Sequence, residues 1–205
     1  MTQAITGSKL TFEEYLELPQ SERRVELVNG ELVELNPPRQ KHHRIQRTLD
    51  YALSEYAKQT SANWEPSVTG QGVQISDDDS YIPDLVVVTA AQWEALEETD
   101  ASSVFLLGNP PLLVIEVVSP SSGKKDTESK LVGYAIAKVP EYWIVNPTAK
   151  TVAIWILDGE AYTCKGTFSG GQRIKSELVR QWSVTVEAIY LHGGMSFAAI
   201  TPPKC

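Results

Sequence analysis

Two short apolar runs, at 82–88 and 112–118, constrain this chain more than any other feature. Apart from Pro83 and two acidic residues, they consist of Val, Leu and Ile, so both faces of each extended segment would be largely apolar. Strands of this kind are central strands, covered on both sides of their sheet. The sequence therefore predicts an α/β domain with these two runs at its centre.

Turn and capping residues along the chain predict the remaining elements. A capping box at 11–14 opens a short helix, and Asn29-Gly30 joins two alternating runs in a hairpin at 25–35. Apolar spacing predicts a helix over 42–58. The other expected helices are 91–98 and 126–139, and the other expected strands are 64–68, 73–75, 141–145, 151–157, 161–168 and 182–186, with a terminal turn at 186–191. We expect a single domain over 1–195 and a loosely held tail over 196–205.

Composition limits the function. A chain of 205 residues suits one domain, and neither a signal peptide nor a membrane-spanning run is recognisable, so a cytoplasmic protein is expected. Cys164 and Cys205 lie too far apart for a zinc motif and are expected to be reduced. The formal net charge of -8 opposes DNA binding through the overall field. A local basic cluster could help, although it could equally be a solvated helix start: Arg39, Lys41, His42, His43, Arg44 and Arg47.

Each apolar run contains one carboxylate. Glu116 lies in the middle of the second run and Asp84 near the start of the first, directly after Pro83. Burying an unpaired carboxylate costs several kcal/mol, on the order expected for ion desolvation, so each acid needs a partner. If the two strands are neighbours, both acids can converge on one Mg²⁺ ion. A structural salt bridge, for example from Glu116 to Lys130, would also account for a buried acid.

The order of these motifs resembles a known family. Pro83-Asp84 followed by Glu116 resembles the PD-(D/E)XK phosphodiesterase signature, and the longer pattern is similar to the bacterial putative restriction endonuclease family called Uma-two. The residues that carry this resemblance are Phe12-Glu13-Glu14-Tyr15, Val25 to Glu31, His42, Ile45, Leu49, Ile115 to Ser122, Asp126, Lys130, Tyr134 and Glu141 to Pro147. The resemblance implies a restriction endonuclease-like fold, a mixed central sheet flanked by helices with an N-terminal β-hairpin.

One position departs from the superfamily signature. Val118 occupies the place of the usual lysine, two residues after Glu116. The resemblance implies that the lysine has moved to Lys130 on the following helix. Asp126, Lys130 and Tyr134 are spaced to lie on one helical face, so Lys130 could reach the site or form a surface pair with Asp126.

The resemblance implies metal-dependent hydrolysis of DNA. Asp84, Glu116 and the Val117 carbonyl would hold Mg²⁺ or Mn²⁺, and Lys130 would orient the attacking water or stabilise charge at the phosphate. Glu26 would support the metal, unless it is an exposed hairpin residue, and His42 could act as a base, bind phosphate or simply begin a helix. A homodimer is expected because a duplex has two strands to cut. Two alternatives remain open, a catalytically inactive nuclease-fold regulatory or assembly protein and a metal-dependent hydrolase of a small phosphate ester.

Overall fold

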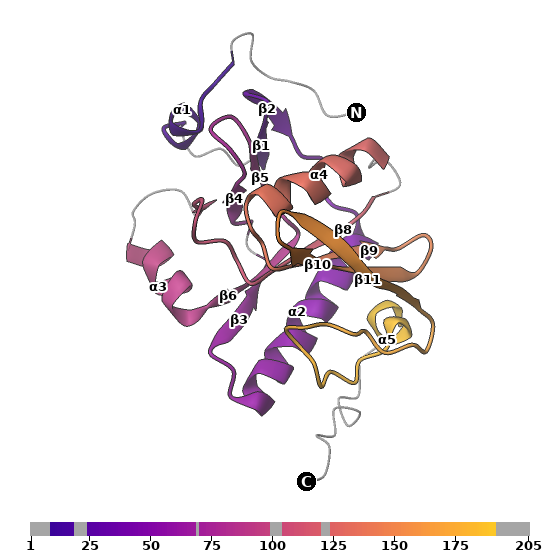
Figure 1. The fold of residues 1–205 in the computed structure, drawn as a ribbon. Helices are drawn as coiled ribbons and strands as arrows, with labels where there is room; N and C mark the ends of the chain where they lie inside the picture. The colour runs from indigo at the N-terminus through magenta and orange to yellow at the C-terminus, as the bar shows by residue number, and fades with distance from the viewer. Residues whose placement is uncertain (1–8, 19–23, 69, 99–103, 120–123, 192–205) are drawn as a thin grey trace.

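The computed structural model describes residues 9–18, 24–68, 70–98, 104–119 and 124–191. Within these residues, two sheets and five helices pack together, and the larger sheet lies between α2 and α4 (Figure 1). The larger sheet contains β3 (Trp64–Ser67), β6 (Leu85–Thr89), β8 (Leu113–Val117), β9 (Glu141–Asn146), β10 (Thr151–Asp158) and β11 (Ala161–Ser169). The smaller contains β1 (Val25–Val28), β2 (Glu31–Glu34), β4 (Gly72–Gln74), β5 (Ser80–Tyr81) and β7 (Val104–Phe105). The helices are α1 (Phe12–Leu16), α2 (Gln40–Thr60), α3 (Ala90–Glu98), α4 (Lys124–Ile136) and α5 (Val186–Tyr190).

The two apolar runs are neighbouring interior strands of the larger sheet. Its strand order is β11-β10-β9-β8-β6-β3, with β6 antiparallel to β8 and β8 parallel to β9. The predicted mixed central sheet flanked by helices is therefore confirmed. The predicted N-terminal hairpin is also present as β1 and β2, and Asn29 and Gly30 both have positive φ, as a tight two-residue turn requires.

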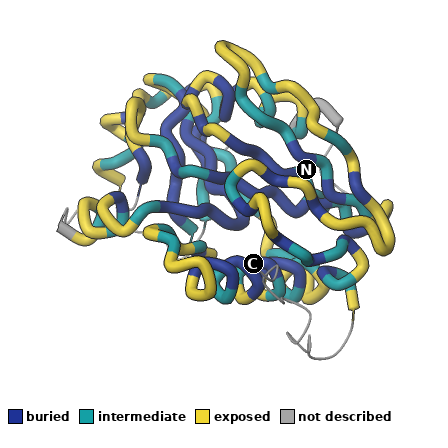
Figure 2. The backbone as a smooth tube through the Cα atoms, turned by 60° about the horizontal axis from the view of Figure 1, so that its bottom comes forward, coloured by how far each residue is buried: buried dark blue, intermediate teal, exposed yellow. Residues whose placement is uncertain are grey.

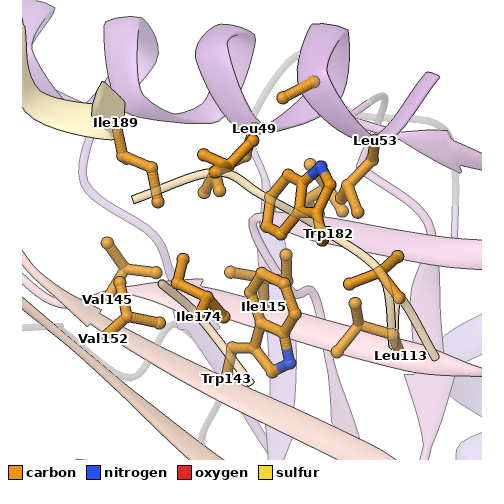
Figure 3. Close-up of a cluster of buried hydrophobic side chains, with 14 of the residues drawn as sticks. Leu49, Leu53, Leu113, Ile115, Trp143, Val145, Val152, Ile174, Trp182 and Ile189 are labelled. Carbon is orange, nitrogen blue, oxygen red and sulfur yellow. The ribbon is translucent and has the colours of Figure 1, made fainter. Parts of the chain in front are cut away.

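Successive side chains of β6, β8 and β9 point to opposite faces of the larger sheet and so divide the core into two layers. The odd-numbered residues Leu113, Ile115 and Trp143 pack with α2 and α5 (Figure 3). The even-numbered Val114 and Tyr142 pack instead with residues of α4 and the smaller sheet. Burial is continuous along the central strands, whereas exposed backbone is concentrated at the periphery (Figure 2). Side chains at even positions of β8 therefore face α4.

Several details differ from the predictions. The first run becomes a strand only at Leu85, because the side chain of Asp84 accepts the Val117 amide. No strand forms over 182–186 among the described residues; Trp182 fills the core there, and one isolated bridge joins Thr185 to Arg173. The short strands β5 and β7 were not predicted. Residues 196–205 lie outside the described part, and within that part no helix is long and apolar enough to cross a bilayer.

Candidate active site

Glu116 points from β8 toward α4. Its Oε1 accepts hydrogen bonds from the Lys130 ammonium at 2.9 Å and from the Tyr134 hydroxyl at 2.7 Å. Lys130 and Tyr134 are one turn apart on α4, so a single helical face supplies both donors. Only 9% of Glu116 is exposed. A carboxylate inside an apolar strand is thus satisfied by two groups of the helix that covers it.

Glu26 brings a second carboxylate to the same lysine. Its Oε1 lies 2.9 Å from the Lys130 Nζ and accepts the Ile82 amide at 2.9 Å. Glu26 belongs to β1 of the smaller sheet and is 4% exposed, so it is not a surface residue of the hairpin. The centre of the Tyr81 ring lies 5.7 Å from the ammonium. Lys130 is therefore a largely buried cation held between acids from two different sheets.

Asp84 lies beside β8 and is anchored on both carboxylate oxygens. Oδ2 accepts the Val117 amide at 2.7 Å, and Oδ1 accepts the side-chain amide of Gln46 at 3.2 Å. The Nε2 of His42 lies 2.8 Å from the same Oδ1. The ring is not aligned for a hydrogen bond, so this buried nitrogen has no hydrogen-bond partner among the described residues. His42 and Gln46, one turn apart on α2, thus both approach Asp84.

Asp84 and Glu116 occupy adjacent positions on neighbouring chain segments. Asp84 directly precedes β6, whose first residue Leu85 pairs with Ile115, the residue before Glu116. Asp84 also accepts the amide of the residue that follows Glu116. The two acids therefore lie at the same end of the central strands, one approached by α2 and the other by α4.

Burial and neighbouring charges shift the ionisation of this cluster. The pKa of Glu116 is raised from 4.5 to about 7, mainly by burial. The positive charge of Lys130 acts to lower this pKa, and the negative charges of Asp84 and Glu26 act to raise it. Burial alone would lower the pKa of Lys130, but Glu116 and Glu26 raise it well above 10.5. Burial and the adjacent Glu116 also raise the pKa of Tyr134 well above 10.0. Near neutral pH, Lys130 and Tyr134 therefore remain protonated while Glu116 changes charge.

Comparison with known proteins places the chain in a family. Residues 12–187 match the family Uma2, described as "Putative restriction endonuclease". The chain belongs to the Uma2 family. A solved structure from Anabaena variabilis ATCC 29413, described as a putative nuclease belonging to DUF820, is similar to this chain with a TM-score of 0.71 and 18% sequence identity. The match covers 88% of this chain and 97% of the other chain. This likeness supports the restriction endonuclease-like fold. Among curated proteins, no match was found.

The donor set of this Uma2 site fits a small divalent cation. Asp84 and Glu116 offer carboxylate oxygens, which suit Mg²⁺ or Mn²⁺ better than softer metals. The buried Nε2 of His42 lies 2.8 Å from Asp84 but makes no hydrogen bond among the described residues, so it is a further polar atom beside the two acids. The described residues contain no cluster of three or more His, Cys, Asp or Glu side chains that could enclose a metal. Such an ion would thus also depend on backbone or water oxygens.

The structure brings together most of the residues that the sequence indicated. Glu26, Glu116 and Lys130 form one contact network. His42, Asp84 and Val117 form a second network beside it. The Glu116–Lys130 pair also matches the structural salt bridge considered as an alternative. That pair alone does not account for Asp84, or for a lysine shared by two acids.

The other sequence-based expectations had different outcomes. Nothing is described for the Asp126 side chain, and residues 120–122 lie outside the described part. The Val118 amide donates to the Val145 carbonyl, as a residue continuing the strand would. In the basic cluster, Lys41 donates to the Pro147 carbonyl. Gln46 was missed; the available signal was its spacing of one turn from His42 on the predicted helix.

Proposed function

We propose that this protein is a metal-dependent endonuclease that hydrolyses DNA phosphodiester bonds. Membership of the Uma2 family supports a nuclease function. The observation that carries the proposal is the shared ammonium: Lys130 lies 2.9 Å from both Glu26 and Glu116, and the charge of Asp84 is close enough to Glu116 to raise its pKa. Keeping two acids and one lysine in a largely buried network is costly, and such networks are concentrated at functional sites.

Asp84 and Glu116, with the Val117 carbonyl, would hold Mg²⁺ or Mn²⁺. When bound, the ion would lower the pKa of a water molecule and polarise a phosphoryl oxygen. Glu116 must be ionised to serve as a ligand, which its pKa of about 7 permits near neutral pH. Asp84 is oriented by the Val117 amide, so its position depends on the same strand that carries Glu116.

Lys130 would orient the attacking water or stabilise negative charge on the reacting phosphate. Its ammonium is held in place by Glu26, whose oxygen is itself fixed by the Ile82 amide. A preorganised cation in a water-poor site stabilises developing charge better than a solvated one. This arrangement would replace the lysine that is absent at Val118. His42 would contact the phosphate or accept a proton, because its Nε2 is buried beside Asp84.

The charge of the protein bears on the choice of substrate. A net charge of -8 opposes approach to DNA, and a small phosphate ester would be affected less. Arg24 adds a cation next to the site, because it donates to the Ile82 and Pro83 carbonyls directly before Asp84.

We propose DNA as the substrate, a single domain over 1–195, a cytoplasmic location and a homodimer that brings two sites to one duplex. Sedimentation at micromolar concentration tests the dimer.

Plasmid nicking with Mg²⁺ or Mn²⁺ tests the function. Asp84→Asn and Glu116→Gln should each abolish nicking, while Glu65→Gln, at an exposed acid of the same sheet, should leave it unchanged. Bis(p-nitrophenyl) phosphate is assayed in parallel. If both site variants nick as well as the wild type, the proposal is wrong. If only the small ester is cleaved, the protein is a hydrolase of small phosphate esters. If it cleaves neither substrate and binds no divalent metal, it is a catalytically inactive protein with a nuclease fold.

A further inference from the structure

We propose that Gln46 is a positioning residue that holds the Asp84 carboxylate in its working orientation. The inference rests on the proposed function, because it assigns Gln46 a task in the same site. Gln46 lies on α2 and is 6% exposed. On the same helix, Ile45 and Leu49 are buried in the core against the central sheet, so the backbone that carries Gln46 is firmly seated.

The contacts of Gln46 converge on one residue. Its Nε2 donates to the backbone carbonyl of Asp84 at 3.0 Å and to Oδ1 of the same residue at 3.2 Å. The backbone carbonyl can only accept, so the amide nitrogen of Gln46 must face Asp84, and the same nitrogen reaches Oδ1. One side chain therefore fixes the backbone and the carboxylate of Asp84 together.

Gln46 and the backbone of β8 together orient the Asp84 carboxylate. Oδ2 of Asp84 accepts the Val117 amide at 2.7 Å, and Gln46 holds the other oxygen. A carboxylate fixed at both oxygens has little rotational freedom about its last side-chain bond. Without the Gln46 amide, Oδ1 would keep only His42, which is not aligned for a hydrogen bond to it. Loss of Gln46 would thus loosen Asp84 without removing it.

A purely structural role for a buried amide is the competing explanation, and Gln92 provides the matched control. Gln92 is also buried, at 9% exposure, and its amide is also satisfied within the protein. It lies on α3, accepts the Thr89 amide at 3.0 Å and donates to the Pro110 carbonyl at 2.7 Å, so these hydrogen bonds hold residues other than Asp84. Replacing either glutamine by methionine keeps the length of the side chain and removes its amide, but only one replacement affects Asp84.

The test compares Gln46→Met and Gln92→Met in the full chain. Calorimetric titration with Mn²⁺ measures metal affinity, plasmid nicking gives kcat and KM, and thermal unfolding reports the fold. Partners that orient a metal ligand typically contribute about 10- to 100-fold in metal affinity or activity. Gln46→Met should therefore weaken Mn²⁺ binding and lower kcat by about that factor, with KM for DNA unchanged. Gln92→Met should leave Mn²⁺ affinity, kcat and KM at the wild-type level.

Two results would overturn the inference. The first is wild-type Mn²⁺ affinity and kcat in Gln46→Met, and the second is an equal loss in Gln92→Met. If Gln46→Met does not fold, Gln46→Asn replaces it, since this amide is one methylene shorter and should show the same loss. Asp84→Asn separates this inference from the proposed function. If Asp84→Asn abolishes Mn²⁺ binding but Gln46→Met does not weaken it, only the role of Gln46 is wrong. If Asp84→Asn changes nothing, the proposed function fails and the inference fails with it.

Discussion

Gly133 of α4 passes so close to Tyr81 of β5 that a Cβ at position 133 would lie 2.6 Å from the Tyr81 Cε2. Real Cβ atoms do not approach ring carbons to this distance, so the helix can lie here only because residue 133 has no side chain. Lys130, one turn earlier on α4, is thereby brought to Glu26 and Glu116. The lysine thus reaches both sheets because a glycine on its own helix permits close packing.

Gly133→Ala should displace α4 and disturb Lys130. Overpacking of a well-filled interior usually costs about 1–3 kcal/mol of unfolding free energy, and nicking should fall because the ammonium moves. Urea unfolding and the nicking assay measure the two effects. Gly171→Ala is the control, because a Cβ there would meet nothing within 4 Å. Equal stability and activity in the two alanine variants would show that Tyr81 yields without moving the helix.

The pKa of Glu116 predicts a pH-dependent stability. Its pKa is about 7 in the folded protein and 4.5 ordinarily, so the folded state binds this proton more tightly than the unfolded state. The resulting stabilisation is fully present below pH 4.5 and is lost as the pH rises through about 7. Glu116→Gln has no proton to lose, so the stability of the wild type should fall relative to this variant across that interval.

Urea unfolding of both proteins at several pH values measures this difference. A constant difference between wild type and Glu116→Gln from pH 4.5 to 7 would contradict the raised pKa. Nicking by the wild type should change in the opposite direction to its stability. Activity should rise toward and above pH 7, because the carboxylate must be ionised to serve as a ligand.

Glu26→Gln should lower the pKa of Glu116. The negative charge of Glu26 is one of the causes that raise that pKa, and its removal leaves the attraction of Lys130 less opposed. The acidic limb of the pH–rate profile should therefore move to lower pH, with Mn²⁺ affinity nearly unchanged if Glu26 holds Lys130 and not the metal. Carbon-13 NMR of the Glu116 carboxyl follows the titration directly. A large loss of Mn²⁺ affinity would instead make Glu26 a metal ligand.

Glu141→Gln should destabilise the fold without affecting metal binding. Glu141 is buried on β9, where Oε1 accepts the Trp143 indole at 2.6 Å and Oε2 accepts the Glu177 and Leu178 amides at 3.0 Å. An amide would turn an NH₂ group toward one of these donors. Leaving buried donors unpaired costs about 1–3 kcal/mol, which urea unfolding would detect. Unchanged stability would mean that the surrounding loop rearranges to accept the amide.

The sequence was most informative where one segment carried its own signal. The apolar runs, the hairpin at Asn29-Gly30 and the capping box at Thr11 all specify local structure, and each is present. Asp84 and Glu116 stood out because carboxylates in apolar runs need partners. The strand predicted at 182–186 is reduced to a single bridge between Thr185 and Arg173, while Trp182, Val184 and Val186 pack into the core.

Contacts between distant segments were harder to predict. The burial of Glu26 depends on how the smaller sheet packs against α4, which hairpin periodicity does not reveal. From spacing alone, Lys130 could form a surface pair with Asp126 or reach the site, and its contacts with Glu26 and Glu116 decide for the site. Gln46 carried only one signal, its spacing of one turn from His42, and a glutamine on a helix is ordinary until its neighbour across the fold is known.

The division of the charged cluster between two sheets has a consequence for how the protein matures. Glu26 arrives on the N-terminal hairpin, whereas Glu116 arrives on the strand at the centre of the larger sheet. A folding intermediate with only the larger sheet assembled would contain Lys130 and Glu116 but lack the acid that steadies the ammonium from the other side. The charged network would then be complete only once the N-terminal hairpin has docked against the rest of the fold.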